Sequence, residues 1–137
     1  MFTADTLANM RVAVFGLTGG VCLLYAVMAL LTGRPDPMPI WIPGLSTVLA
    51  WLVLTLASRS AGNRTAAMAW DEGYAADARR AASIAFWFSV LLYPAFGLML
   101  ALDVIVWNLA FAAMGTLIGA FYLLLLAAFD LRGPGQR

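Results

Sequence analysis

One short stretch of the sequence gathers side chains that could do acid–base or metal chemistry. The segment WDEGYAADARRAASIAFW holds five of the chain's 8 basic and 7 acidic residues. These five are Asp71, Glu72, Asp77, Arg79 and Arg80. Two adjacent carboxylates make a poor metal site without further ligands, because hard cations take six or more oxygen atoms. The segment therefore predicts a charged surface rather than a metal centre.

The rest of the composition removes several kinds of chemistry. Histidine is absent, and the single cysteine, Cys22, lies inside an apolar run. Bis-histidine haem ligation, histidine zinc sites and histidine general-base catalysis are therefore excluded. We expect no catalytic residue, no metal and no cofactor, and a protein that is not an enzyme.

The elements that must position the charged segment are strongly apolar. The chain is 64% hydrophobic and 11% charged, whereas soluble domains are about 45–50% apolar and about 25% charged. A net charge of +1 offers no dense basic face for nucleic acid. The composition indicates an integral membrane protein.

Four apolar segments are long enough to cross a bilayer, which takes about 20 residues per helix. The first is read as a retained anchor, because it is longer than the apolar core of a cleavable signal peptide. The predicted fold is all-α: an integral membrane four-helix bundle made of two helical hairpins, in one membrane domain over 1–137. Its spans are 12–32, 40–57, 81–102 and 105–128.

Two short turns and one longer segment join these spans. The proline-rich run 33–39 and the stretch Asp103–Asn108 predict the tight reversals. The longer segment, 58–80, predicts a loop that turns at Gly62-Asn63 and then, from about Thr65, a helix continuous with the third span.

Arginine placement predicts the orientation. Only Arg34 falls on one side of the predicted membrane, and seven arginines fall on the other: Arg11, Arg59, Arg64, Arg79, Arg80, Arg132 and Arg137. The positive-inside rule then places both termini and the 58–80 segment in the cytoplasm. We expect a multi-pass protein of the bacterial inner membrane.

Small residues recur at four-residue spacing on three of the predicted helices. The helix-packing candidates are Gly16, Gly20, Ala85, Ser89, Gly115 and Gly119. Such rows let helix backbones approach closely in lipid. They predict packing within the bundle or, alternatively, a homodimer interface.

The charged segment allows structural and functional interpretations. Asp71 and Glu72 suit the start of a helix, Asp77 and Arg80 are spaced to pair on one helix face, and arginines at a span's edge reach the headgroups. A docking face is the functional alternative, formed by Asp71, Glu72, Asp77, Arg79 and Arg80.

The same residues carry a family resemblance. Asp71-Glu72, Arg80-Ala81 and Ile84-Ala85-Phe86-Trp87 resemble the motif D-E-R-D-x-x-I-x-x-K-A-x-x-I-A-Y-Y of an uncharacterised group of small bacterial four-helix membrane proteins. This chain departs from the motif at Gly73-Tyr74, where the group has Arg-Asp, and at Asp77, where it has Ile. The resemblance implies the same layout of helices, with the motif in the cytoplasm between the second and third.

Together these features predict a non-enzymatic accessory or regulatory membrane protein. It would act by association with a partner protein or lipid through segment 64–80. The expected partners are membrane lipids and, in addition, another membrane protein or a second copy of the chain in a homo-oligomer. The alternative is a small transporter or channel formed by oligomerisation through the glycine faces. A lipid-modifying enzyme is less favoured, because no nucleophile–base pair or metal cluster is visible in the sequence.

Overall fold

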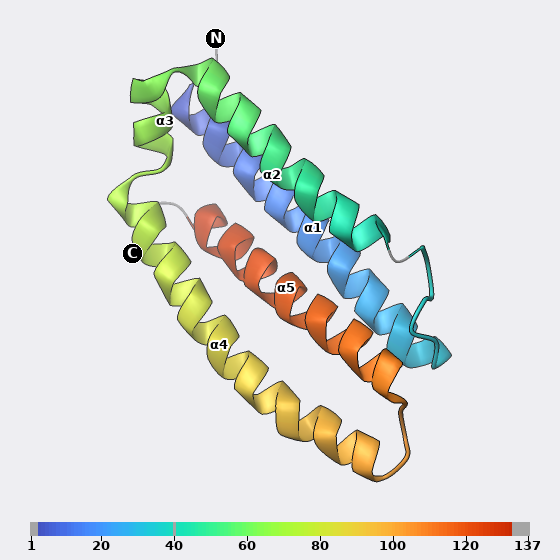
Figure 1. Cartoon of the computed structure of the whole chain (residues 1–137). Coiled ribbons are helices and arrows are strands. Elements are labelled where there is room, and N and C mark those ends of the chain that lie inside the picture. Colours follow the sequence, from blue (N-terminus) through green and yellow to red (C-terminus); the bar gives the residue numbers. More distant parts are fainter. Residues whose placement is uncertain (1–2, 40, 133–137) are drawn as a thin grey trace.

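The computed structural model describes residues 3–39 and 41–132, and within these ranges it contains helices and no strand. The helices are α1 (Ala4–Thr32), α2 (Trp41–Ala61), α3 (Asn63–Ala69), α4 (Glu72–Ala101) and α5 (Trp107–Leu131) (Figure 1). The predicted all-α class is confirmed. Ile40, the predicted start of the second span, and Arg137 lie outside the described residues.

Four of the helices are long and apolar enough to cross a membrane: α1, α2, α4 and α5, with 29, 21, 30 and 25 residues. Each overlaps most of one predicted span, although α1 begins at Ala4, well before residue 12, and α5 begins at Trp107, two residues after the predicted start. The Thr3 hydroxyl accepts a hydrogen bond from the Thr6 amide and so caps this earlier start. A capped first turn satisfies an amide that would otherwise lack a partner.

Both predicted tight reversals are present. Gly33 ends α1 with φ of +66°, a left-handed conformation that glycine adopts without steric cost. Tyr25 is 1% exposed, and its hydroxyl donates to the Pro35 carbonyl, which holds the proline-rich turn against α1. At the second reversal, α4 ends at Ala101 and α5 begins at Trp107, with exposed Asp103 in the turn between them.

The 58–80 segment differs from its prediction. Residues 58–61 continue α2 instead of forming a loop, and the chain turns at Gly62, whose φ is +83°. The helix predicted to run unbroken from about Thr65 into the third span was wrong, because α3 ends at Ala69 and α4 starts at Glu72. At this break the Arg11 side chain of α1 binds the Ala69 carbonyl, as described below.

The long helices lie in the order α2, α1, α5, α4 (Figure 1). Each hairpin pairs its own two helices, and the most extensive contact in the protein joins α1 to α5. Ala26 and Ala29 of α1, and Ala113 and Ala120 of α5, are at most 1% exposed. Small buried side chains allow helices to approach closely where lipid supplies no hydrophobic drive.

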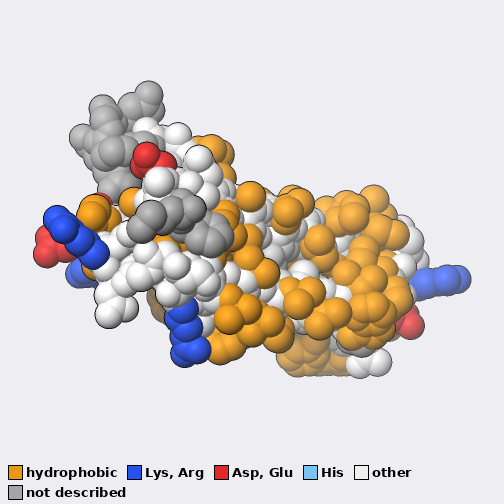
Figure 2. Space-filling model, turned by 90° about the horizontal axis from the view of Figure 1, so that it is seen from above, with side chains coloured by type: hydrophobic (Ala, Val, Ile, Leu, Met, Phe, Trp, Pro, Cys, Tyr) orange, Lys and Arg blue, Asp and Glu red, His pale blue; other side chains and the backbone are white. Residues whose placement is uncertain are grey.

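Charge and apolar surface are segregated along the molecule. The starts of α1 and α4 and the ends of α2 and α5 meet at one end, which also holds α3 (Figure 1). We call this the arginine-rich end; its described arginines are Arg11, Arg59, Arg64, Arg79, Arg80 and Arg132. On the face seen in Figure 2, hydrophobic side chains cover the length between two charged ends.

Candidate functional site

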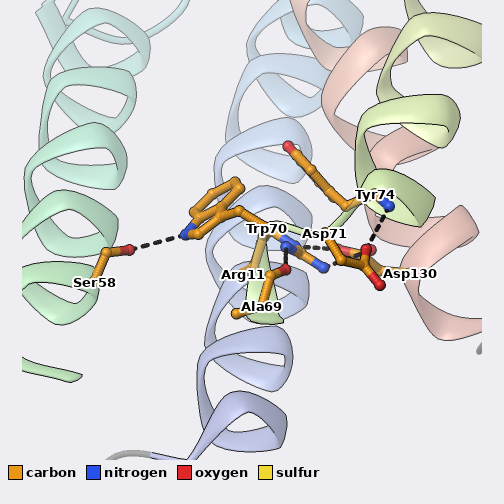
Figure 3. A network of polar contacts seen from close by, with 7 residues as sticks. All are labelled: Arg11, Ser58, Ala69, Trp70, Asp71, Tyr74 and Asp130. Atoms are coloured by element: carbon orange, nitrogen blue, oxygen red, sulfur yellow. Dashed lines mark hydrogen bonds and ion pairs between the residues drawn. The ribbon is translucent and has the colours of Figure 1, made fainter. Parts of the chain in front are cut away.

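A buried arginine organises the arginine-rich end. Arg11, on the third turn of α1, is 5% exposed. Its Nε and Nη2 atoms donate to the two carboxylate oxygens of Asp130 on α5, at 2.6 and 2.9 Å. Its Nη1 atom donates to the Ala69 carbonyl, at the end of α3, at 2.6 Å (Figure 3). One guanidinium therefore joins α1, α5 and the α3–α4 junction.

Two aromatic rings complete the surroundings of this guanidinium. Its central carbon lies 4.0 Å from the ring centroid of Tyr74 and 5.0 Å from that of Trp70. A cation within about 6 Å of an aromatic face is attracted by the ring's quadrupole. We call Arg11, Ala69, Trp70, Tyr74 and Asp130 the Arg11 cluster.

The cluster also holds the end of α2. The Trp70 indole Nε1 donates to the Ser58 hydroxyl at 3.0 Å (Figure 3). The Trp70 and Tyr74 rings meet edge to face, with centroids 4.9 Å apart. All five helices are thus connected at this end through hydrogen bonds, ring contacts or the ion pair.

The chemistry of the Arg11 cluster is that of a structural clasp. The side chains of Arg11 and Asp130 are only 6% and 5% exposed, and the paired geometry uses both carboxylate oxygens. Removing one partner of such a buried pair is strongly unfavourable, because it leaves the other charge buried without compensation. Among the described residues, no three His, Cys, Asp or Glu side chains come together as a metal site.

The sequence analysis missed this clasp. Arg11 was interpreted only as a charge that sets orientation, and Asp130 was not singled out. The available signal was that two opposite charges flank predicted spans 12–32 and 105–128 on the same side of the membrane. The contact between them depends on α1 packing against α5, a pairing that the apolar pattern does not specify.

The acidic residues of the predicted docking face have different environments. Asp71 is exposed and caps α4, accepting a hydrogen bond from the Tyr74 amide at 2.8 Å. Glu72 is exposed in the first turn of α4, as expected for a carboxylate near a helix start. Asp77 is half-buried. The expected helix-starting role of Asp71 is confirmed.

The two arginines of the predicted face are both exposed on α4. Arg79 Nε donates to the Ala75 carbonyl at 3.2 Å. The Arg80 guanidinium lies 5.6 Å from the ring centroid of Phe129 on α5. The expected pairing of Asp77 with Arg80 stays a prediction.

The helix-packing candidates separate into two groups. Ala85 is buried, at 6% exposure, and Ser89 is half-buried with its hydroxyl bonded to the Phe86 carbonyl. The four glycines of the predicted pairs make no close contact within the chain, since a Cβ atom on any of them would meet nothing within 4 Å. These are Gly16, Gly20, Gly115 and Gly119. No close helix contact is therefore seen at these four glycines within the described chain, and their packing between copies stays a prediction.

The glycine at the tight contact is a different one. A Cβ atom on Gly19 would lie 2.9 Å from Leu124 Cγ and 3.2 Å from Leu123 Cβ. Gly19 thus faces α5 at the central α1–α5 contact. The four-residue spacing in the sequence predicted Gly16 and Gly20 as packing residues instead, and these lie on other sides of α1.

Comparison of the chain with protein-family models, with curated proteins and with solved structures finds no match.

Proposed function

We propose that this chain is a non-enzymatic, multi-pass protein of the bacterial inner membrane that acts by associating with a partner protein. The membrane location is supported by four apolar helices of 21 residues or more, because about 20 residues cross the hydrocarbon core. The positive-inside rule then puts the arginine-rich end, and both termini, in the cytoplasm.

The proposed docking surface consists of the exposed side chains of Asp71, Glu72, Arg79 and Arg80. Glu72 and Arg79 are seven residues apart, which places them on one face of α4, two turns from each other. The surface is acidic where the helix begins and basic nearer the apolar segment. A protein surface of complementary charge order fits this pattern better than an anionic bilayer, which would repel the acidic half.

The observation that carries the proposal is that the docking surface begins at a junction fixed to the rest of the bundle. The α3–α4 junction is bound by Arg11, which is itself fixed to Asp130 on α5. The charges of the docking surface therefore stand on a segment tied to the bundle at its first residues. A pre-organised surface loses less conformational freedom on binding and so favours specific association.

The test neutralises the docking surface without removing the helix cap. The variant Asp71→Asn/Glu72→Gln/Arg79→Gln/Arg80→Gln keeps a capping side chain, since Asn caps as well as Asp. Co-purification from native membranes in mild detergent should recover a partner with the natural chain and lose it with this variant.

The matched control removes charge from the opposite end, as Arg34→Gln/Asp36→Asn/Asp103→Asn, and should retain the partner. Equal recovery by the natural chain and the docking variant would contradict the proposal. Loss of bound anionic lipid without loss of any protein would assign the surface to the bilayer instead.

A small oligomeric transporter or channel is the second candidate function. It is supported by the open space around Gly16, Gly20, Gly115 and Gly119, which leaves these faces available for close packing between copies. Solute or ion flux into liposomes, lost in Gly115→Leu/Gly119→Leu, would favour this function. A monomer without flux would exclude it.

The resemblance to the uncharacterised four-helix membrane group is also part of the proposal. It rests on Asp71-Glu72, Arg80-Ala81 and Ile84–Trp87, and it would make the acidic-then-basic order a shared feature of docking.

A further inference from the structure

We propose that a groove between α2 and α5 binds one acyl chain of an anionic phospholipid, with the headgroup at Arg59. The groove has a volume of about 470 Å³. Its floor includes Thr18 of α1, and its walls include Leu54 of α2 and Leu123 of α5. The proposal rests on the membrane location proposed above, but not on the docking surface.

The groove has the length of one bilayer leaflet. Along α2 its lining runs from Thr47 to Arg59, which is roughly 18 Å at about 1.5 Å per residue. Half of the hydrocarbon core of a bilayer is about 15 Å thick. A groove that begins at the arginine-rich end and continues for this distance matches an acyl chain of the cytoplasmic leaflet.

The shape and lining of the groove suit a hydrocarbon chain. A helix with its side chains is about 10–12 Å across, whereas an extended acyl chain fits a narrow channel. Most of the groove is lined by apolar side chains, including Phe15, Leu54 and Leu123. The groove therefore favours an acyl chain as its occupant.

The mouth of the groove supplies the charge that an anionic headgroup requires. Arg59 is exposed, lines the groove and, among the described residues, takes no part in an ion pair. Beside it stand Ser58 and the Trp70 indole, an aromatic group of the kind enriched at membrane interfaces. The phosphate of a lipid at this position would contact a cation and polar groups. The acyl chain of the same lipid would lie along the groove.

The test measures lipid selectivity by native mass spectrometry. Purified protein is supplied with equal amounts of phosphatidylglycerol and phosphatidylethanolamine that carry identical acyl chains. We expect the natural chain to retain phosphatidylglycerol preferentially. Arg59→Gln should lower that preference about fivefold, as expected for one arginine near an anionic surface. Arg64→Gln, at an exposed site outside the groove, should leave it unchanged.

A second variant tests the groove itself. Ala50→Phe places a ring in the groove and should reduce retention of both lipids, whereas Val53→Phe, on an exposed part of α2 outside it, should not. Equal retention of the two lipids by the natural chain would overturn the proposal. So would an unchanged preference in Arg59→Gln, or undiminished binding in Ala50→Phe. Because the docking variant keeps Arg59, its loss of a protein partner with lipid retained would separate the two proposals.

Discussion

The buried guanidinium of Arg11 is the residue on which the arginine-rich end depends. It is 5% exposed and bonded to both oxygens of Asp130 and to the Ala69 carbonyl. Because Arg11 is buried, loss of its partner would destabilise the protein strongly: a charge without its partner in a low-dielectric site is unfavourable. The clasp therefore holds three segments together only while both charged partners are present.

Replacing Asp130 by Asn should destabilise the protein strongly. The substitution keeps the shape of the side chain but leaves Arg11 buried beside a neutral group, which costs about 3–5 kcal/mol in the free energy of unfolding. Chemical unfolding in detergent, followed by circular dichroism, measures the loss. The exposed Asp103→Asn should change the free energy by less than about 0.5 kcal/mol. Equal stability of Asp130→Asn and the natural chain would show that the ion pair is not formed.

At Asp71, two substitutions separate capping from charge. Asp71→Ala removes the acceptor of the Tyr74 amide bond and should lower the free energy of unfolding by about 1 kcal/mol. Asp71→Asn retains an acceptor and should cost much less. The same unfolding measurement compares them, and equal losses in the two variants would argue that the carboxylate's charge, not its cap, stabilises α4.

At the scale of elements, the close approach of α1 and α5 is the central packing feature. Gly19 leaves no room for a side chain, whereas Gly20, the next residue, faces open space. The two glycines therefore form a matched pair on the same helix.

Gly20→Ala should stabilise the protein by up to about 1 kcal/mol, because alanine favours the helix. Gly19→Ala gains the same propensity but pushes against Leu124 near its branch point, and overpacking costs about 1–3 kcal/mol. It should therefore be the less stable of the two in a thermal unfolding series. A Gly19→Ala variant as stable as Gly20→Ala would mean that α1 and α5 lie further apart.

The long helices were predictable from the sequence because their signals are local. Uncharged runs of about 20 residues, prolines at 35, 37 and 39, and the polar stretch at 103–108 mark the spans and reversals directly. The break at Trp70-Asp71 was not predictable in this way. The alanine-rich sequence favours an unbroken helix, and the interruption is stabilised by Arg11, which is 58 residues away from Ala69 in the chain.

For the same reason, only part of the candidate site was predictable from the sequence. The charges of Glu72, Arg79 and Arg80 could be singled out from the sequence, because charged residues make up only 11% of this chain. The Arg11 cluster and the α2–α5 groove required knowledge of which helices are neighbours. Periodicity gives each helix its faces, but it does not say which face meets which helix.

At the scale of the whole molecule, the features on which both proposals rest lie at one end. The arginine-rich end holds the Arg11 cluster, the docking surface and the mouth of the groove at Arg59. The opposite end holds two short turns with Arg34, Asp36 and Asp103. Both proposals therefore require the arginine-rich end to face the cytoplasm, where partner proteins and anionic lipid headgroups are available.

Thiol labelling in cells tests that orientation most directly. In a Cys22→Ser background, single cysteines are placed at two exposed positions, Ala76→Cys at the arginine-rich end and Val104→Cys in the turn between α4 and α5. A membrane-impermeant maleimide should label the cysteine at 104 from outside the inner membrane and reach the cysteine at 76 only after permeabilisation. Labelling of position 76 without permeabilisation, with position 104 protected, would contradict the proposed orientation and both proposals built on it.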